Sequence, residues 1–183
     1  MCGIVALVSR PSRRPVPTTA EILTGLDRAV AAGPDAESAV AALDVVNQAL
    51  KGVPGLVALD DDGLVRAITD RLRTVSETVD RLEAALESEA TDPEALERQS
   101  ARLIAWRDVL WAITRDRLGT ARAVRDLAGE NASWSTRRGY LTIHRSLAAL
   151  DRLEVRGRDS AGIHLFVWNH GIDAADEDLT KIL

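Results

Sequence analysis

The stretch DDDGLVRAITDRLRTVSETVDRLEAALESE, residues 60–89, carries the strongest structural signal in this chain. Its large apolar residues recur every three or four positions, at Leu64, Ile68, Leu72, Val75, Val79, Leu82 and Leu86. Arginine and acidic residues lie between them, and the spacing is close to a heptad repeat, which predicts one long amphipathic helix. The acidic residues at 60–62 lie at the start of this helix, where negative charge is favourable, so we interpret them as structural.

A second long helix is predicted directly after the turn at 91–93, because Pro93 suits the first position of a helix. Apolar residues continue at helical spacing at Leu96, Leu103, Trp106, Leu110, Ile113 and Val124. Two helices joined by a short turn are expected to pack antiparallel, and at ~1.5 Å per residue each would be roughly 40 to 50 Å long. We therefore expect a projecting helical hairpin, with Trp106 and Trp111 as core or helix-contact residues.

Two shorter helices are predicted before the hairpin. Thr18 and Glu21 have the spacing of a capping box, and the helix that follows has one apolar face formed by Ile22, Leu23, Leu26 and Val30. A further amphipathic segment begins near Asp35, with apolar residues at Val40, Leu43, Val46 and Leu50. The sequence KGVPG, residues 51–55, is expected to break it.

The two ends of the chain are predicted to contain strands. GIVALVS at residues 3–9 is apolar and rich in β-branched side chains, and AGIHLFVW at 161–168 is rich in strand-forming residues. Between the hairpin and the second strand, a polar break at 129–135 precedes a final helix marked by Ile143, Leu147, Leu150 and Leu153. The order strand, helical block, helix, strand predicts an α+β fold.

Charge and hydropathy restrict the class of protein. Of the 183 residues, 46% are hydrophobic and 28% are charged, which is typical of a globular protein. Acidic residues outnumber basic ones by 28 to 23, and the basic stretch at 10–14 is short, so we expect no nucleic-acid partner. No apolar run reaches the ~18 residues that span a bilayer, and the chain lacks the basic start of a signal peptide, so we expect no membrane association.

Cysteine and histidine content narrows the chemistry. A single cysteine excludes a disulfide within the chain and a thiolate metal cluster, which favours a cytoplasmic protein. The three histidines lack metal-ligand spacing with one another or with Cys2, so the sequence predicts no metal and no cofactor.

Cys2 is the most informative position for chemistry. Removal of Met1 would expose a thiol and an α-amine on one residue. The α-amine titrates near ~7.7 to 8.0, so it can act as a general base for a thiol whose ordinary pKa is ~8.5. Gly3 leaves room for a substrate to approach the backbone. Taken alone, a cysteine at the second position is more often incidental.

MCGIVALV at 1–8 and RGRDSAGI at 156–163 together resemble the class II glutamine amidotransferases, which are N-terminal-nucleophile hydrolases, and most closely the glutaminase domain of glucosamine-6-phosphate synthase. The resemblance implies an α+β amidotransferase piece in which Cys2 attacks glutamine, and ammonia passes to a sugar-phosphate or other acceptor domain downstream of this chain. It also implies that the following residues bind glutamine or shape its site: Gly3, Arg156, Gly157, Asp159 and Ser160. For Asp159, a capped turn after a helix is an equal alternative.

The resemblance divides the chain into three parts. Residues 1–30 hold the first strand, loop and helix of the amidotransferase domain, 31–139 form a mostly helical insertion, and 140–183 hold the final helix, the RGRDSAG turn and the second strand, expected to continue beyond Leu183. The family's glutamine-binding segment and its Asn-Gly oxyanion pair are absent, so we expect this chain alone to be inactive. The alternative function is a non-catalytic interaction or regulatory protein, in which the helical insertion binds a protein partner or another copy.

Overall fold

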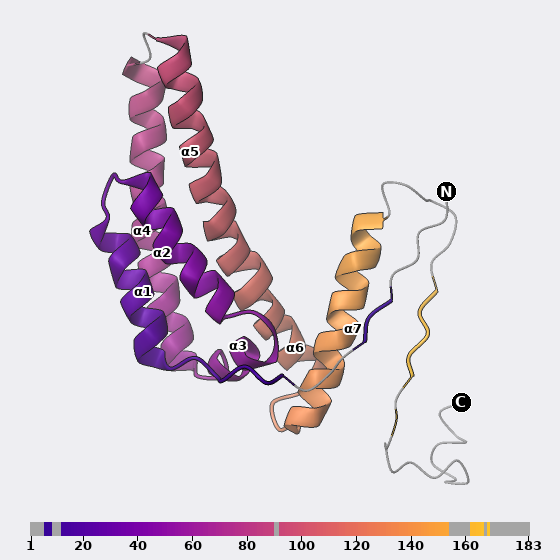
Figure 1. The fold of residues 1–183 in the computed structure, drawn as a ribbon. Helices are drawn as coiled ribbons and strands as arrows, with labels where there is room; N and C mark the ends of the chain where they lie inside the picture. Colours follow the sequence, from indigo (N-terminus) through magenta and orange to yellow (C-terminus); the bar gives the residue numbers. More distant parts are fainter. Residues whose placement is uncertain (1–5, 9–11, 90–91, 154–161, 167, 169–183) are drawn as a thin grey trace, which may run out of the picture.

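The computed structural model describes residues 6–8, 12–89, 92–153, 162–166 and 168. The elements in chain order are α1 (Thr19–Ala31), α2 (Ala36–Ala49), α3 (Gly52–Ala58), α4 (Asp62–Glu89), α5 (Pro93–Trp111), a π-helical segment (Ala112–Gly119), α6 (Thr120–Ala128) and α7 (Trp134–Leu153). Figure 1 shows α4 and α5 as a long hairpin whose tip projects beyond α1 and α2. Helices α1 and α2 pack on each other and on α4 and α5, whereas α7 packs mainly on α6.

The predicted α+β fold is wrong for the part of the chain that the structure describes, which contains helices and no strand. Residues 6–8 and 162–166, taken from the two predicted strands, have no regular secondary structure, and their side chains are exposed: Val8 by 82% and Phe166 by 73%. A β-branched or aromatic run forms a strand only where a neighbouring strand pairs with it and a packed face covers its side chains. Here the described core consists of helices alone.

The predicted helix starts are confirmed by their caps. The Thr18 side chain accepts a hydrogen bond from the backbone N–H of Glu21, and the Glu21 carboxylate accepts one from the N–H of Thr18, which completes the capping box. The carboxylates of Asp35 and Asp92 cap α2 and α5 by accepting hydrogen bonds from backbone N–H groups of the first turn. The Asp61 carboxylate accepts from backbone N–H groups in the first turn of α4. Each cap of this kind contributes ~1 kcal/mol to helix stability.

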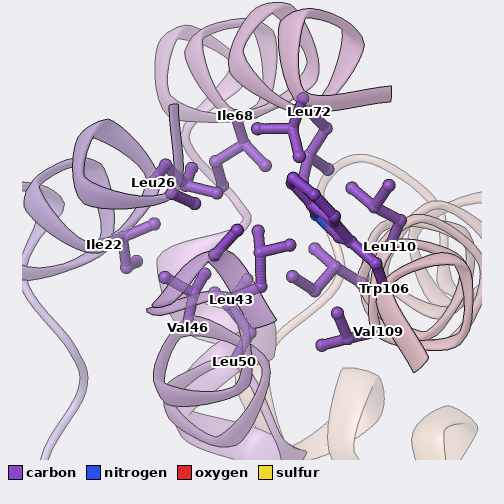
Figure 2. Close-up of a cluster of buried hydrophobic side chains, with 14 of the residues drawn as sticks. Ile22, Leu26, Leu43, Val46, Leu50, Ile68, Leu72, Trp106, Val109 and Leu110 are labelled. Carbon is purple, nitrogen blue, oxygen red and sulfur yellow. The ribbon is translucent and has the colours of Figure 1, made fainter. Parts of the chain in front are cut away.

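The apolar face predicted for residues 64–86 lies in the main core. Leu64, Ile68, Leu72, Val75 and Val79 are buried, and Leu82 and Leu86 pack at the edge of the cluster. Figure 2 shows side chains of α1, α2, α4 and α5 meeting around Trp106, which is fully buried. Between α1 and α2 the approach is so close that a Cβ on Gly25 would lie 2.5 Å from the Val46 Cγ2. The core interpretation is confirmed for Trp106 and is wrong for Trp111, which is 56% exposed.

The stretch at 51–55 interrupts the helical pattern as predicted, but it also contains the start of α3, which the sequence reading missed. Gly52 has φ +74°, a conformation that favours glycine, and Pro54 lies in the first turn, where its missing N–H is not needed. Gly55 lies against the end of α2, because a Cβ there would be 1.9 Å from the Leu50 carbonyl oxygen. These breakers therefore build a tight corner between α2 and α3.

Three predicted apolar faces differ at single residues. Val30 on α1, Leu96 on α5 and Leu147 on α7 are exposed, the last by 46%. On α7, Leu141 is buried instead, in a small cluster with Leu56 of α3 and Val124 of α6. This cluster is separate from the main core, so α7 is anchored by much less apolar contact than α1, α2, α4 and α5. No described helix combines the length and apolar character needed to cross a membrane.

Candidate functional site

The site residues predicted from the sequence lie outside the described residues; these are Cys2, Gly3, Arg156, Gly157, Asp159 and Ser160. Their roles stay predictions. What the structure does describe is the chain that leads into and out of the helical block between them, together with a polar cavity beside that chain.

The chain that enters the helical block is fixed by Arg14. Its guanidinium donates hydrogen bonds to the carbonyl oxygens of Gln48, at 2.7 Å, and of Lys51. The Gln48 carbonyl lies in the last turn of α2, where a helix leaves acceptors without partners and where a cation is favourable, and Lys51 is the N-cap residue of α3. Arg14 therefore holds the segment before α1 against the corner between α2 and α3.

The helix that leads out of the block lies at the same corner. A Cβ built on Gly52 would be 3.6 Å from Nη2 of Arg145, which is on α7. The backbone at 51–52 thus accepts a hydrogen bond from the entering segment and lies near Arg145 of α7. In Figure 1 the segment before α1 passes below α3 toward α7. The segments that lead to the two sequence motifs therefore meet one end of the helical block.

A half-open cavity of about 260 Å³ lies beside this corner, between α3, the π-helical segment, α6 and α7. Its apolar wall includes Leu50, Leu56, Leu59 and Leu141. Its polar lining comes from Asp116, Arg117, Thr120, His144 and Arg145. π-Helical turns are often found at functional sites, and this one carries Asp116 and Arg117.

Arg117 is held by a long-range contact. Its Nε donates a hydrogen bond of 2.9 Å to Oδ1 of Asn47, a buried residue of α2. Burial lowers the pKa of Arg117; the carboxylate of Asp116 opposes this change, and the positive charge of Arg145 adds to it. The two guanidiniums are therefore near enough to repel each other. Among the described residues, no ion pair links either of them to a carboxylate within 4.0 Å.

His144 and Thr120 connect the two helices of the cavity. Nε2 of His144 on α7 and Oγ1 of Thr120 on α6 are 3.3 Å apart, so one hydrogen bond joins them, with the donor set by the imidazole tautomer. Within the described ranges, no group of three His, Cys, Asp or Glu residues could hold a metal ion. The cavity offers hydroxyl, imidazole and guanidinium groups to a ligand.

The other arginine clusters form ion pairs and hydrogen bonds that join neighbouring helices. Arg107 of α5 donates to Glu83 and Asp80 of α4, which ties the hairpin together. At the start of α4, Arg125 binds Asp62 at 2.7 Å. Arg137 binds Asp60 and the carbonyl oxygen of Glu130. The structural interpretation of the aspartates at 60–62 is therefore confirmed, with partners on α6 and α7 that the sequence did not indicate.

Sequence reasoning missed the cavity. Its polar residues are distributed over two helices and the π-helical segment, and Asn47 and Arg117 are 70 positions apart. One local signal was present: from 114 to 123 the apolar helical pattern lapses, and Leu118 is the only large apolar residue. Such a lapse inside a long helix indicates that polar side chains replace the apolar face over this segment. Comparison of the chain with protein-family models, curated proteins and solved structures finds no match.

Proposed function

We propose that this chain supplies the nucleophile of a glutamine-hydrolysing amidotransferase, with Cys2 as the catalytic residue. The observation that carries the proposal is the pair of motifs, MCGIVALV and RGRDSAGI, in this order in one chain. The positions of Arg14 and Arg145 support it, because both approach the backbone at 51–52. A block that the chain enters and leaves at one end can sit between two parts of a site without separating them.

The proposed reaction uses only Cys2, glutamine and water. The α-amine of Cys2 accepts the thiol proton, and the sulfur attacks the side-chain amide carbon of glutamine. The carbon–nitrogen bond then breaks, and the proton returns to the leaving nitrogen, so ammonia departs and a thioester remains. Water attacks the thioester carbon, which releases glutamate and restores the thiol.

Ammonia would pass to an acceptor outside these residues, a sugar phosphate or another amine acceptor. The 183 residues lack the family's Asn-Gly oxyanion pair. Loss of one oxyanion donor raises the barrier by ~2.7 to 4 kcal/mol. We therefore expect the chain to hydrolyse glutamine only together with the groups that complete its site. The single cysteine is consistent with the reducing cytoplasm as the compartment in which this thiol works.

The test is glutamate release by the complete gene product that contains these residues, with Met1 removed. We expect activity in this form and its loss in Cys2→Ala. The matched control is the same protein with Met1 retained, which should be inactive because the α-amine of Cys2 is then part of a peptide bond. Equal activity in Cys2→Ala, or no activity once Met1 is removed, would refute the proposal.

The second candidate is a non-catalytic interaction protein that binds a partner through the helical block. It is favoured by Ile104 and Trp111, which lie two turns apart on α5 and are exposed by 60% and 56%. Large apolar side chains that share an exposed face are typical of binding surfaces. Intact-mass measurement separates the two functions: a mature Cys2 terminus supports the enzyme, and a retained Met1 supports the interaction protein.

A further inference from the structure

The cavity between α3, the π-helical segment, α6 and α7 carries two positive charges that the described residues leave incompletely neutralised. Arg117 uses Nε on the neutral amide of Asn47, and within the described residues its Nη atoms make no hydrogen bond. Arg145 makes no hydrogen bond or ion pair with any described residue. Among the described residues that line the cavity, Asp116 is the one carboxylate, so the arginines outnumber the acids there.

Several other partly or fully buried arginines of the helical block have carboxylate partners, whereas the exposed Arg115 and Arg122 and the partly buried Arg138 have none among the described residues. Arg71 binds Asp27 at 2.6 Å, Arg125 binds Asp62, and Arg137 binds Asp60. In each of these pairs a carboxylate neutralises the positive charge of the guanidinium. Arg117, which is partly buried, and Arg145, which is exposed, line the same cavity without a carboxylate partner among the described residues, and the repulsion between their like charges is relieved when an anion binds between them.

The arrangement of donors favours a tetrahedral oxyanion. Arg117 comes from the π-helical segment, Thr120 from α6, and His144 and Arg145 from α7. These groups surround the cavity from different walls. The oxygens of a phosphate point in several directions and can accept from several walls at once, whereas the two oxygens of a carboxylate lie in one plane. Arginine is also well suited to bind phosphate oxygens in pairs.

The size and the apolar wall of the cavity limit the size and polarity of the group that a bound phosphate can carry. A volume of about 260 Å³ is small for a ligand pocket, and Leu56, Leu59 and Leu141 line one part of it. This space suits a phosphate group with a short carbon chain. We propose that the cavity is a binding site for a small phosphate ester, held by Arg117 and Arg145, independent of the proposed glutaminase activity.

A bound phosphate would also fasten α7. Apart from its packing on α6, this helix makes few contacts with the rest of the block. An anion held by Arg117 and Arg145 would add a connection between α7 and the π-helical segment, whose Arg117 is in turn bonded to Asn47 of α2. The expected signature is slower amide hydrogen exchange in α7 when the ligand is bound.

The experiment is calorimetric titration of the 183-residue chain at constant ionic strength with inorganic phosphate, glycerol 3-phosphate and acetate. We expect saturable binding of the first two, with glycerol 3-phosphate at least as tight as phosphate, and binding of acetate weaker by about tenfold or more. Arg145→Gln should weaken phosphate binding by about tenfold or more. Arg145 is exposed and makes no hydrogen bond or ion pair with a described residue, so this variant is expected to keep its melting temperature.

Two further variants test the free volume of the cavity and the position of the positive charge separately. Ala149→Leu fills part of the cavity on α7 without changing charge, and it should also weaken binding. Arg115→Gln removes an exposed arginine outside the cavity and is the matched control, which should bind as the wild type does. Absence of saturable phosphate binding would overturn the proposal. So would acetate binding as tight as phosphate, or an equal loss of affinity in Arg115→Gln and Arg145→Gln.

Discussion

Replacement of Trp106 by alanine tests whether the α1, α2, α4 and α5 core is the stability centre of this chain. Trp106 is fully buried where the side chains of these helices meet. A buried tryptophan removes about 150 to 250 Å² from water, which at ~25 cal/mol per Å² corresponds to at most about 4 to 6 kcal/mol. Observed costs of removing a core tryptophan or phenylalanine are about 3 to 5 kcal/mol.

One feature of Trp106 places the expected value near the lower end of this range. Its indole N–H is buried and makes no hydrogen bond within the described residues. An unpaired buried donor costs ~1 to 3 kcal/mol, and the alanine variant no longer carries that cost. We therefore expect a loss of about 3 kcal/mol, which lowers the melting temperature by roughly 6 to 12 °C in a chain of this size. Trp106→Phe should lose less, below about 2 kcal/mol, because it keeps a ring and removes the N–H.

The assay is thermal and urea unfolding followed by circular dichroism. The matched control is Trp111→Ala, the same substitution five positions along the chain, at the exposed last residue of α5, where a change within ~0.5 kcal/mol is expected. Equal destabilisation by the two alanine variants would refute the reasoning. A loss well above about 2 kcal/mol in Trp106→Phe would show that the buried N–H is not a cost.

Three other outcomes are expected. Gly55→Ala should destabilise the chain strongly, because its Cβ would overlap the backbone at the end of α2. Gly139→Ala, which adds a Cβ in open space on α7, should instead raise the stability by ~1 kcal/mol. Melting temperatures measure both effects. A hydrogen bond from an arginine of α6 lowers the pKa of Asp62 in the folded protein, so its contribution is present at neutral pH and is lost as the pH falls through that lowered value. Between pH 7 and pH 3 the melting temperature should therefore fall less steeply in Asp62→Asn than in the wild type. Residues 12–153 expressed alone should give a helical spectrum and melt cooperatively at a higher temperature than 31–139, because the shorter piece lacks the buried side chains of α1; equal melting temperatures would contradict this.

The parts of the fold that sequence could predict are those fixed by local physics. The capping box of Thr18 and Glu21, the cap of Asp92 before Pro93 and the heptad-like face of α4 depend on residues a few positions apart, and all are observed. The strands at 3–9 and 161–168 could not be decided locally, because a strand requires a partner whose place in the sequence the run itself does not specify.

The cavity was hidden for the same reason. Asn47, Arg117 and His144 are far apart in sequence and come together only through the packing of α2, the π-helical segment and α7. The corner at 51–55 was hidden for a different reason. Gly52 and Gly55 were interpreted as breakers, whereas Gly52 permits a positive φ and Gly55 permits contact with the end of α2. The predicted site at Cys2 depends on two motifs and stays a prediction.

The main core and helix α7 are stabilised by different kinds of contact, and this difference bears on the proposed function. The α1, α2, α4 and α5 core rests on a large apolar cluster, which salt does not weaken. Helix α7, which precedes the RGRDSAGI motif, is held by the small cluster around Leu141, by the ion pair of Arg137 with Asp60 and by the hydrogen bond between Thr120 and His144. Segments with few buried apolar contacts open at lower free energy than the core to which they are attached. Polar contacts therefore contribute much of what holds α7 to the rest of the helical block, and an anion between Arg117 and Arg145 would hold the same helix.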